Sequence, residues 1–138
     1  HNIKFHVNSV PINNCDVSIM SGTYNYAVTD DIDLWEGYLI HNLSRCIMKS
    51  NLGVVFNLQF EKKRTIRNNI YYTNINFMFE LLKQNFKKIE KFYTNNSSKD
   101  IYFIVYKNWN LFCLNASYII IETELAKFKL LLSAAIGI

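Results

Sequence analysis

The sequence predicts an α+β fold: a mostly antiparallel sheet, with two longer amphipathic helices and a short C-terminal helix packed on one face. Three observations lead to this prediction. Apolar and polar residues alternate near the start of the chain, two long stretches have helical spacing, and two continuous apolar runs come later. Strands joined by short turns, with helices on one face, favour this class over a doubly wound fold. The chain has 138 residues, half of them apolar, which is enough for a single domain over residues 1–138.

The first 26 residues predict short strands. Polar and apolar residues alternate over residues 3–7, and again over residues 17–20 and 23–26. Pro11 closes the first run, and Ser21-Gly22 marks a bend between the other two. We therefore expect a hairpin or meander here.

A helix is predicted to follow. Residues 29–33 supply short oxygen-bearing side chains that cap a helix start, and carboxylates that favour the positive end of its dipole. Apolar residues at helical spacing continue to Ile47, and Ser50-Asn51 ends the pattern. The apolar residues 53–58 then predict a buried strand.

Residues 75–93 show the clearest periodicity in the chain. Apolar side chains recur at spacings of four and three residues: Ile75, Phe79, Leu82, Phe86, Ile89 and Tyr93. Lysines fall on the opposite side, so we expect an amphipathic helix of about five turns. The preceding residues 61–71 predict a polar, basic connection.

The last third of the chain predicts a hairpin and a closing helix. Residues 101–106 and 109–114 are apolar and aromatic, and Lys107-Asn108 between them suits a tight turn. Leu125, Phe128 and Leu132 have the spacing of one helix face.

No short motif predicts a metal or cofactor site. The densest carboxylates are Asp30, Asp31, Asp33 and Glu36. A calcium loop would need ligands at alternate positions and a distal Glu, so we interpret this group as a helix cap. The four glycines have neither dinucleotide-binding nor phosphate-loop spacing. We therefore expect no metal and no cofactor.

No short motif predicts a catalytic site either. His6, His41 and Cys46 match no metal-protease, redox or nucleophile-elbow pattern. We therefore expect a protein that is not an enzyme. A Cys–His pair assembled across the fold is the alternative.

Cysteine usage indicates the compartment. Cys15, Cys46 and Cys113 are odd in number, far apart and set among apolar neighbours. This is typical of free thiols in a reducing compartment, and hence of an intracellular protein of the cytoplasm or nucleus. The apolar residues 128–138 are too few for a bilayer span, so we expect no membrane span and interpret them as a buried element. The start of a membrane anchor is the competing interpretation.

Charge is unevenly placed along the chain. The net charge is +4, but residues 1–60 carry −2 and residues 61–91 carry +5. A candidate basic patch lies in the second stretch: Lys62, Lys63, Arg64 and Arg67. Such side chains neutralise phosphates, and the neighbouring Tyr71 and Tyr72 could stack on bases. The patch is the basis of an alternative hypothesis, nucleic-acid binding, and a solvated charged loop is the simpler interpretation.

Aromatic residues give the leading hypothesis. Two Trp, nine Tyr and ten Phe are more than one small core buries comfortably. Surplus aromatics commonly serve as anchors at protein interfaces. The sequence therefore predicts a non-catalytic protein–protein interaction or assembly module that self-associates or pairs with a protein partner. The candidate interface aromatics are Trp109, Tyr102, Phe79 and Phe86.

Residues 52–93 resemble the small heterodimeric proteasome-assembly chaperones. The resemblance rests on a helix around residues 34–47, a strand over 54–59 that contains Asn57-Leu58, and the amphipathic stretch 75–93. The upstream Phe5-His6-Val7 is also similar. The resemblance implies a non-enzymatic α+β module that pairs with a partner subunit and cradles an assembly intermediate.

Overall fold

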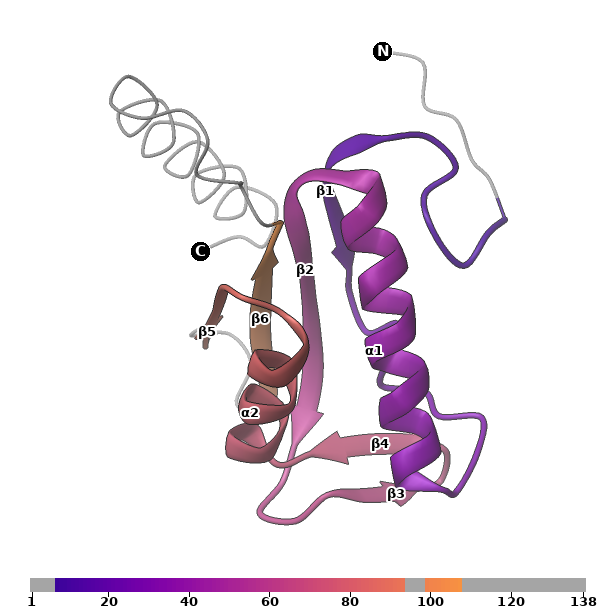
Figure 1. The fold of residues 1–138 in the computed structure, drawn as a ribbon. Helices are drawn as coiled ribbons and strands as arrows, with labels where there is room; N and C mark the ends of the chain where they lie inside the picture. Colours follow the sequence, from indigo (N-terminus) through magenta and orange to yellow (C-terminus); the bar gives the residue numbers. More distant parts are fainter. Residues whose placement is uncertain (1–6, 94–98, 108–138) are drawn as a thin grey trace. The chain divides into compact units, whose positions relative to one another are not determined.

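The computed structural model describes residues 7–93 and 99–107. The chain divides into two compact units, residues 1–108 and 109–138, and the described residues all belong to the first. The described residues form two helices and one curled sheet, which confirms the α+β class (Figure 1). The predicted strand over 109–114 and the predicted C-terminal helix lie outside the described residues. The expected strand over 3–7 does too, except for Val7.

The first strand, β1, spans Cys15–Met20, and the first helix, α1, spans Ile32–Lys49. The predicted helix start is confirmed, because the Asp31 side chain accepts a hydrogen bond from the Leu34 backbone N–H at 3.0 Å. The predicted end is also confirmed. Ser50 adopts an extended conformation there and begins the next strand.

The central strand is β2, Ser50–Phe60, which runs between neighbours on both sides (Figure 1). It pairs in parallel with β1 and with β4, which spans Ile70–Thr73. On its other side it pairs antiparallel with β6, Asp100–Tyr106. The sheet order is β3-β4-β2-β6-β5, with β1 beside β2 off this path.

The sheet is mixed, because β1–β2 and β2–β4 are parallel pairs beside the antiparallel pairs β2–β6, β3–β4 and β5–β6. The prediction of a mostly antiparallel sheet is therefore not confirmed. The expected meander is wrong. Residues 23–26 form turns with one isolated bridge, Tyr26 to Ile70, because β1 takes its partner from β2 across the long helix α1.

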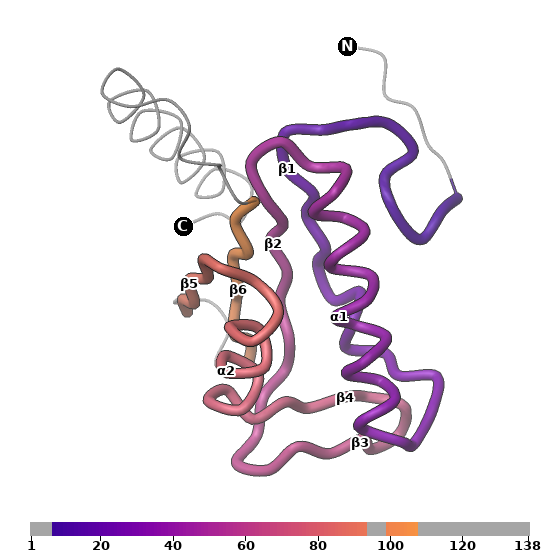
Figure 2. The backbone as a smooth tube through the Cα atoms, viewed as in Figure 1, coloured from indigo at the N-terminus to yellow at the C-terminus, as the bar shows by residue number. Residues whose placement is uncertain are grey.

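A hairpin replaces the polar connection expected over residues 61–71. β3, Thr65–Arg67, pairs antiparallel with β4. The two residues between the strands, Asn68 and Asn69, have positive φ angles of 50° and 63°, a conformation that Asn tolerates better than most residues. Figure 2 shows this hairpin running crosswise to β2 near its end.

The amphipathic stretch 75–93 is not one helix. α2 spans only Ile75–Asn85, and β5 spans Ile89–Phe92. The chain turns extended at Phe86, whose φ is −136°. Ile89 contacts the core as a strand residue, and β5 pairs antiparallel with β6.

Both helices pack on the same face of the sheet. Val54, Phe56 and Leu58 point from β2 into one hydrophobic cluster, as the two-residue period of a strand requires. The cluster joins side chains of α1, α2, β2, β4 and β6: Trp35, Leu39, Leu43, Cys46, Val54, Phe56, Leu58, Tyr71, Met78, Leu82, Ile101, Phe103 and Val105. The core therefore depends on residues from the whole described part of the chain.

Candidate interaction surface

A buried carboxylate links α1 to the β3–β4 hairpin. Glu36 is only 4% exposed, although it lies one turn into a surface helix. The Tyr71 hydroxyl donates a hydrogen bond to its Oε1 at 2.5 Å, and Arg64 Nη1 donates to its Oε2 at 2.7 Å. A buried charge is tolerated only when it is paired and hydrogen-bonded in this way. We call Glu36, Arg64 and Tyr71 the buried polar cluster.

The ionisation of this cluster follows from its surroundings. Burial raises the pKa of Tyr71, and the hydrogen bond to Glu36 raises it further. Partial burial opposes the charge on Arg64, but Glu36 and the nearby Asp33 outweigh that effect and raise its pKa. The Arg64 guanidinium also lies over the Phe77 ring, 3.9 Å from its centre. Because Tyr71 is fully buried, this arrangement stabilises the fold and offers no access to a substrate.

The carboxylates that the sequence grouped together have two roles. Asp31 caps α1, as expected. Asp33 and Glu36 both pair with the partly exposed Arg64, and of these two carboxylates only Glu36 is buried. In the described part of the chain, no three His, Cys, Asp or Glu side chains gather into a group that could hold a metal ion.

The candidate basic patch is divided in two. Arg64 belongs to the buried polar cluster, and Arg67 forms an ion pair with Glu61 and lies over the Tyr72 ring at 4.9 Å. Lys62 and Lys63 instead line an open groove of about 880 Å³. The two arginines of the patch are thus held in ion pairs, whereas the two lysines line the groove.

The candidate interface aromatics are half-buried where the structure describes them. Phe79 and Phe86 pack against the core from α2, and Tyr102 stacks on Phe92 with ring centres 5.2 Å apart. Trp109 lies outside the described residues. The sequence missed Tyr93, which is 57% exposed just after β5, because the long-helix interpretation assigned it to the buried stripe.

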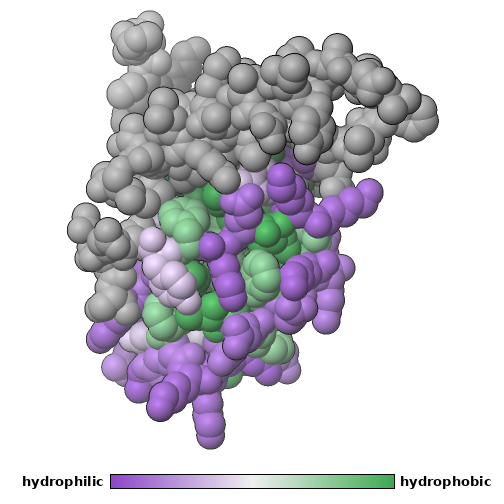
Figure 3. Space-filling model, turned by 90° about the vertical axis from the view of Figure 1, so that its left-hand side faces the viewer, coloured by the Kyte–Doolittle hydropathy of each residue, from purple (hydrophilic) through white to green (hydrophobic). Residues whose placement is uncertain are grey.

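One surface gathers several of these aromatics. Lysine ammonium groups lie over the Phe79 ring from both Lys83 and Lys91, each 4.6 Å from its centre. Figure 3 shows hydrophobic side chains gathered on the side of the molecule where α2 and β5 lie, with hydrophilic side chains around and across them. We define the α2–β5 surface as Phe79, Lys83, Phe86, Lys91 and Tyr93.

The described thiols and imidazole do not meet as a catalytic pair. Cys15 and Cys46 are free thiols, and burial raises the pKa of Cys46. Cys15 lies 3.4 Å from the Ser18 hydroxyl in a second groove of about 530 Å³, which Cys46 also lines. His41 lies on the exposed side of α1, whereas His6 and Cys113 fall in ranges that the structure leaves undescribed.

Neither α1 nor α2, the two helices within the described ranges, has the length and apolarity needed to cross a bilayer. Comparison with models of protein families, with curated proteins and with solved structures found no match.

Proposed function

We propose that this protein is a non-catalytic protein–protein interaction or assembly module. The observation that supports it is the α2–β5 surface, where two lysine ammonium groups lie over the half-buried Phe79 ring and Tyr93 is exposed. Aromatics that are partly desolvated before binding, with a polar surround, are typical of the central residues of protein interfaces.

Further apolar side chains are exposed on α1. Leu34, Tyr38 and Met48 are 63%, 48% and 68% exposed. Leu34 and Tyr38 are one turn apart, and Met48 lies on the same side of the helix near its other end. They give the module a second apolar stripe, which suits a protein that contacts more than one neighbour in an assembly.

The resemblance to the small heterodimeric proteasome-assembly chaperones belongs to the same proposal. It would make the chain one half of a heterodimer that holds an assembly intermediate. Of the three segments on which it rests, two are α1 and β2, whereas the third, expected as one helix over residues 75–93, is divided into α2 and β5.

The experiment is cross-linking followed by mass spectrometry on the full chain, expressed in its own cell, together with light scattering of the purified protein. We expect either a self-associated species or one stoichiometric partner, cross-linked to lysines of the α2–β5 surface. Replacing Tyr93 by Ser should weaken that complex, while Val28→Ser, at an exposed residue before α1, serves as the control. A protein that remains strictly monomeric and yields no stoichiometric cross-link would overturn the proposal.

Nucleic-acid binding through Lys62, Lys63, Arg64 and Arg67 is the second candidate. The observation that supports this candidate is that Lys62 and Lys63 line the groove, where they could contact phosphates. Binding of single-stranded RNA or duplex DNA at low salt, with a steep loss as salt rises, would support it. An affinity for nucleic acid that does not change with salt concentration, or no binding at low salt, would contradict this candidate function.

A further inference from the structure

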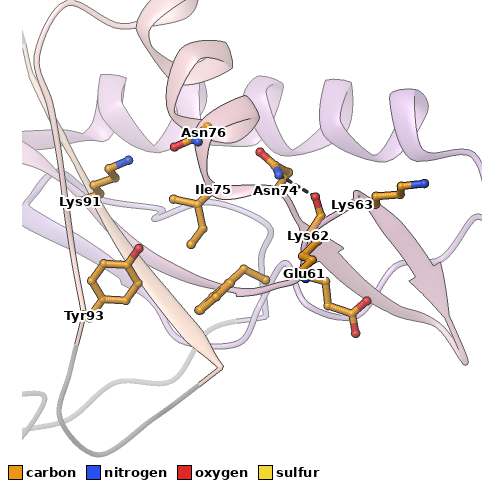
Figure 4. Close-up of a pocket in the computed structure, with 9 residues that line it drawn as sticks. Glu61, Lys62, Lys63, Asn74, Ile75, Asn76, Lys91 and Tyr93 are labelled. Atoms are coloured by element: carbon orange, nitrogen blue, oxygen red, sulfur yellow. Dashed lines mark hydrogen bonds between the residues drawn. The ribbon is translucent and has the colours of Figure 1, made fainter.

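The groove of about 880 Å³ lies where three elements meet. The end of β2 and the turn after it form one wall, the start of α2 forms the second, and the end of β5 forms the third (Figure 4). Its lining residues are Phe60, Glu61, Lys62, Lys63, Asn74, Ile75, Asn76, Lys91 and Tyr93. An opening of this size is large enough for several side chains of a bound peptide.

The floor of the groove is apolar. The rings of Phe60 and Tyr93 meet edge to face with their centres 6.1 Å apart. Ile75 also lines the groove, on the side where Tyr93 lies (Figure 4). Because Tyr93 keeps 57% of its surface exposed, an apolar side chain entering the groove would bury it further. Removal of that surface from water would stabilise the complex.

The rim of the groove is positive. Lys62 and Lys63 come from the turn after β2, and Lys91 comes from β5. Within the described residues, none of these three lysines forms an ion pair. The one acidic lining residue, Glu61, is already neutralised by Arg67. No acidic residue occupies the first turn of α2, which begins at this groove.

We propose that this groove binds an acidic segment of a protein partner, with one aromatic or branched aliphatic side chain as its anchor. The inference rests on the proposed function and names the chemistry of the partner. The anchor fills the space over Phe60, Ile75 and Tyr93, while Asp or Glu residues on either side of it meet the lysine rim. Complementary charge of this kind speeds association and selects the partner.

An acidic peptide fits the groove better than a nucleic acid does. Nucleic-acid binding depends on several phosphate contacts along the backbone, and arginine is the best donor for them. Here Arg64 and Arg67 are both held in intramolecular ion pairs. The edge-to-face contact also leaves the Phe60 and Tyr93 rings unable to act as parallel platforms for successive bases.

The test is a selection from a phage-displayed random peptide library on the full chain. We expect the recovered sequences to be enriched in Asp and Glu around an aromatic, Leu or Ile residue. A fluorescein-labelled synthetic copy of a recovered peptide should bind roughly ten-fold more weakly to the Lys62→Glu/Lys91→Glu variant than to the unchanged protein. Tyr93→Ala should also weaken binding of the peptide, because it removes apolar surface from the floor of the groove and leaves the charge of the rim unchanged.

A matched control separates the groove from overall charge. The Lys49→Glu/Lys87→Glu variant changes the net charge by the same amount at the end of α1 and just beyond α2, and neither residue lines the groove. It should bind the peptide within about two-fold of the unchanged protein, because the remaining effect is long-range and screened by salt. Thermal melts of each variant confirm that the fold is retained.

Several outcomes overturn the inference. The first is a selection whose peptides are not enriched in Asp and Glu, and the second is a selection that yields no binding peptide. The third is a peptide that binds the Lys62→Glu/Lys91→Glu variant as tightly as the unchanged protein. Groove-dependent binding of fluorescent oligo(dT) or oligo(U) in place of acidic peptides overturns it in favour of a nucleic acid. If the cross-linking experiment finds a partner on another surface, the groove inference fails while the proposed function stands. If it finds none, the proposed function fails on its own test.

Discussion

Two neighbouring regions of this protein use the same basic stretch in opposite ways. In the buried polar cluster, Arg64 turns inward, donates to Glu36 and stacks on Phe77. In the groove, Lys62 and Lys63 remain at the rim without an ion pair to a described residue. The difference follows from side-chain chemistry. A planar guanidinium satisfies two carboxylates and an aromatic face together, whereas a compact ammonium stays hydrated. The first region therefore stabilises the fold and the second is available to a partner.

The largest expected effect comes from removing the inward arginine. Arg64→Ala leaves the Glu36 carboxylate buried with only the Tyr71 hydroxyl as a partner. We expect the free energy of unfolding to fall by about 3 kcal/mol, the low end for a broken buried pair because Arg64 is partly exposed. Urea denaturation measures it. Arg67→Ala, which breaks an exposed pair, should cost less than about 1 kcal/mol. Equal losses for the two variants would contradict the distinction.

Tyr71→Phe sharpens the same comparison without changing shape. The variant removes the hydroxyl that donates to Glu36 and keeps the ring in the core. The expected loss is about 1.5 kcal/mol at neutral pH, since a charged acceptor loses one donor. Tyr72→Phe, on a half-buried neighbour, is the control and should change stability little. A neutral result at Tyr71 would mean that the cluster contributes no stability.

Alkaline pH provides a third comparison. Burial raises the pKa of Tyr24 and of Tyr71, with the Glu36 hydrogen bond adding to the shift at Tyr71. The unfolded chain therefore releases these protons first, near the ordinary tyrosine pKa of about 10. Stability is fully present below that pH and falls above it, by about 1.4 kcal/mol per pH unit for each such tyrosine. Denaturation midpoints between neutral and strongly alkaline pH measure the slope, which should be shallower in Tyr71→Phe.

The smallest expected effect on stability belongs to the groove. Lys62→Glu/Lys91→Glu changes two rim residues, and only the contact of Lys91 with the Phe79 ring is lost. We expect a change below about 1 kcal/mol in the free energy of unfolding, by the same urea titration. A loss as large as that of Arg64→Ala would place the rim lysines in the folding core and leave the groove without a separate role.

The fold could be predicted in part because local signals decide local structure. The Asp31 cap, the spacing along α1 and the Ser50 stop all act within a few residues, and each prediction is confirmed. The β3–β4 hairpin could also have been predicted, because Asn68-Asn69 lies between two short strand-like runs. The basic residues around this turn led us to predict a polar connection instead.

The division of residues 75–93 could not be decided locally. Ile89 fits the helical spacing of the stretch, but its conformation depends on pairing with β6, which comes later in the chain. In the same way, the parallel pairing of β1 with β2 requires the crossover through α1. Each of these strands could pair with several others that are distant in the sequence, and the spacing of residues does not predict which pair forms.

By itself, the sequence determined the α+β class, both helix starts, the central strand and the excess of aromatic and basic side chains. Those properties come from propensities and periodicities that act over one or two turns of chain. Only the tertiary structure decided that Glu36 is buried, that the arginines of the basic stretch are neutralised internally, and that Lys62, Lys63 and Lys91 surround one apolar groove. Whether a charge is paired or free depends on which distant side chain lies within hydrogen-bonding reach, and only the folded chain establishes that distance.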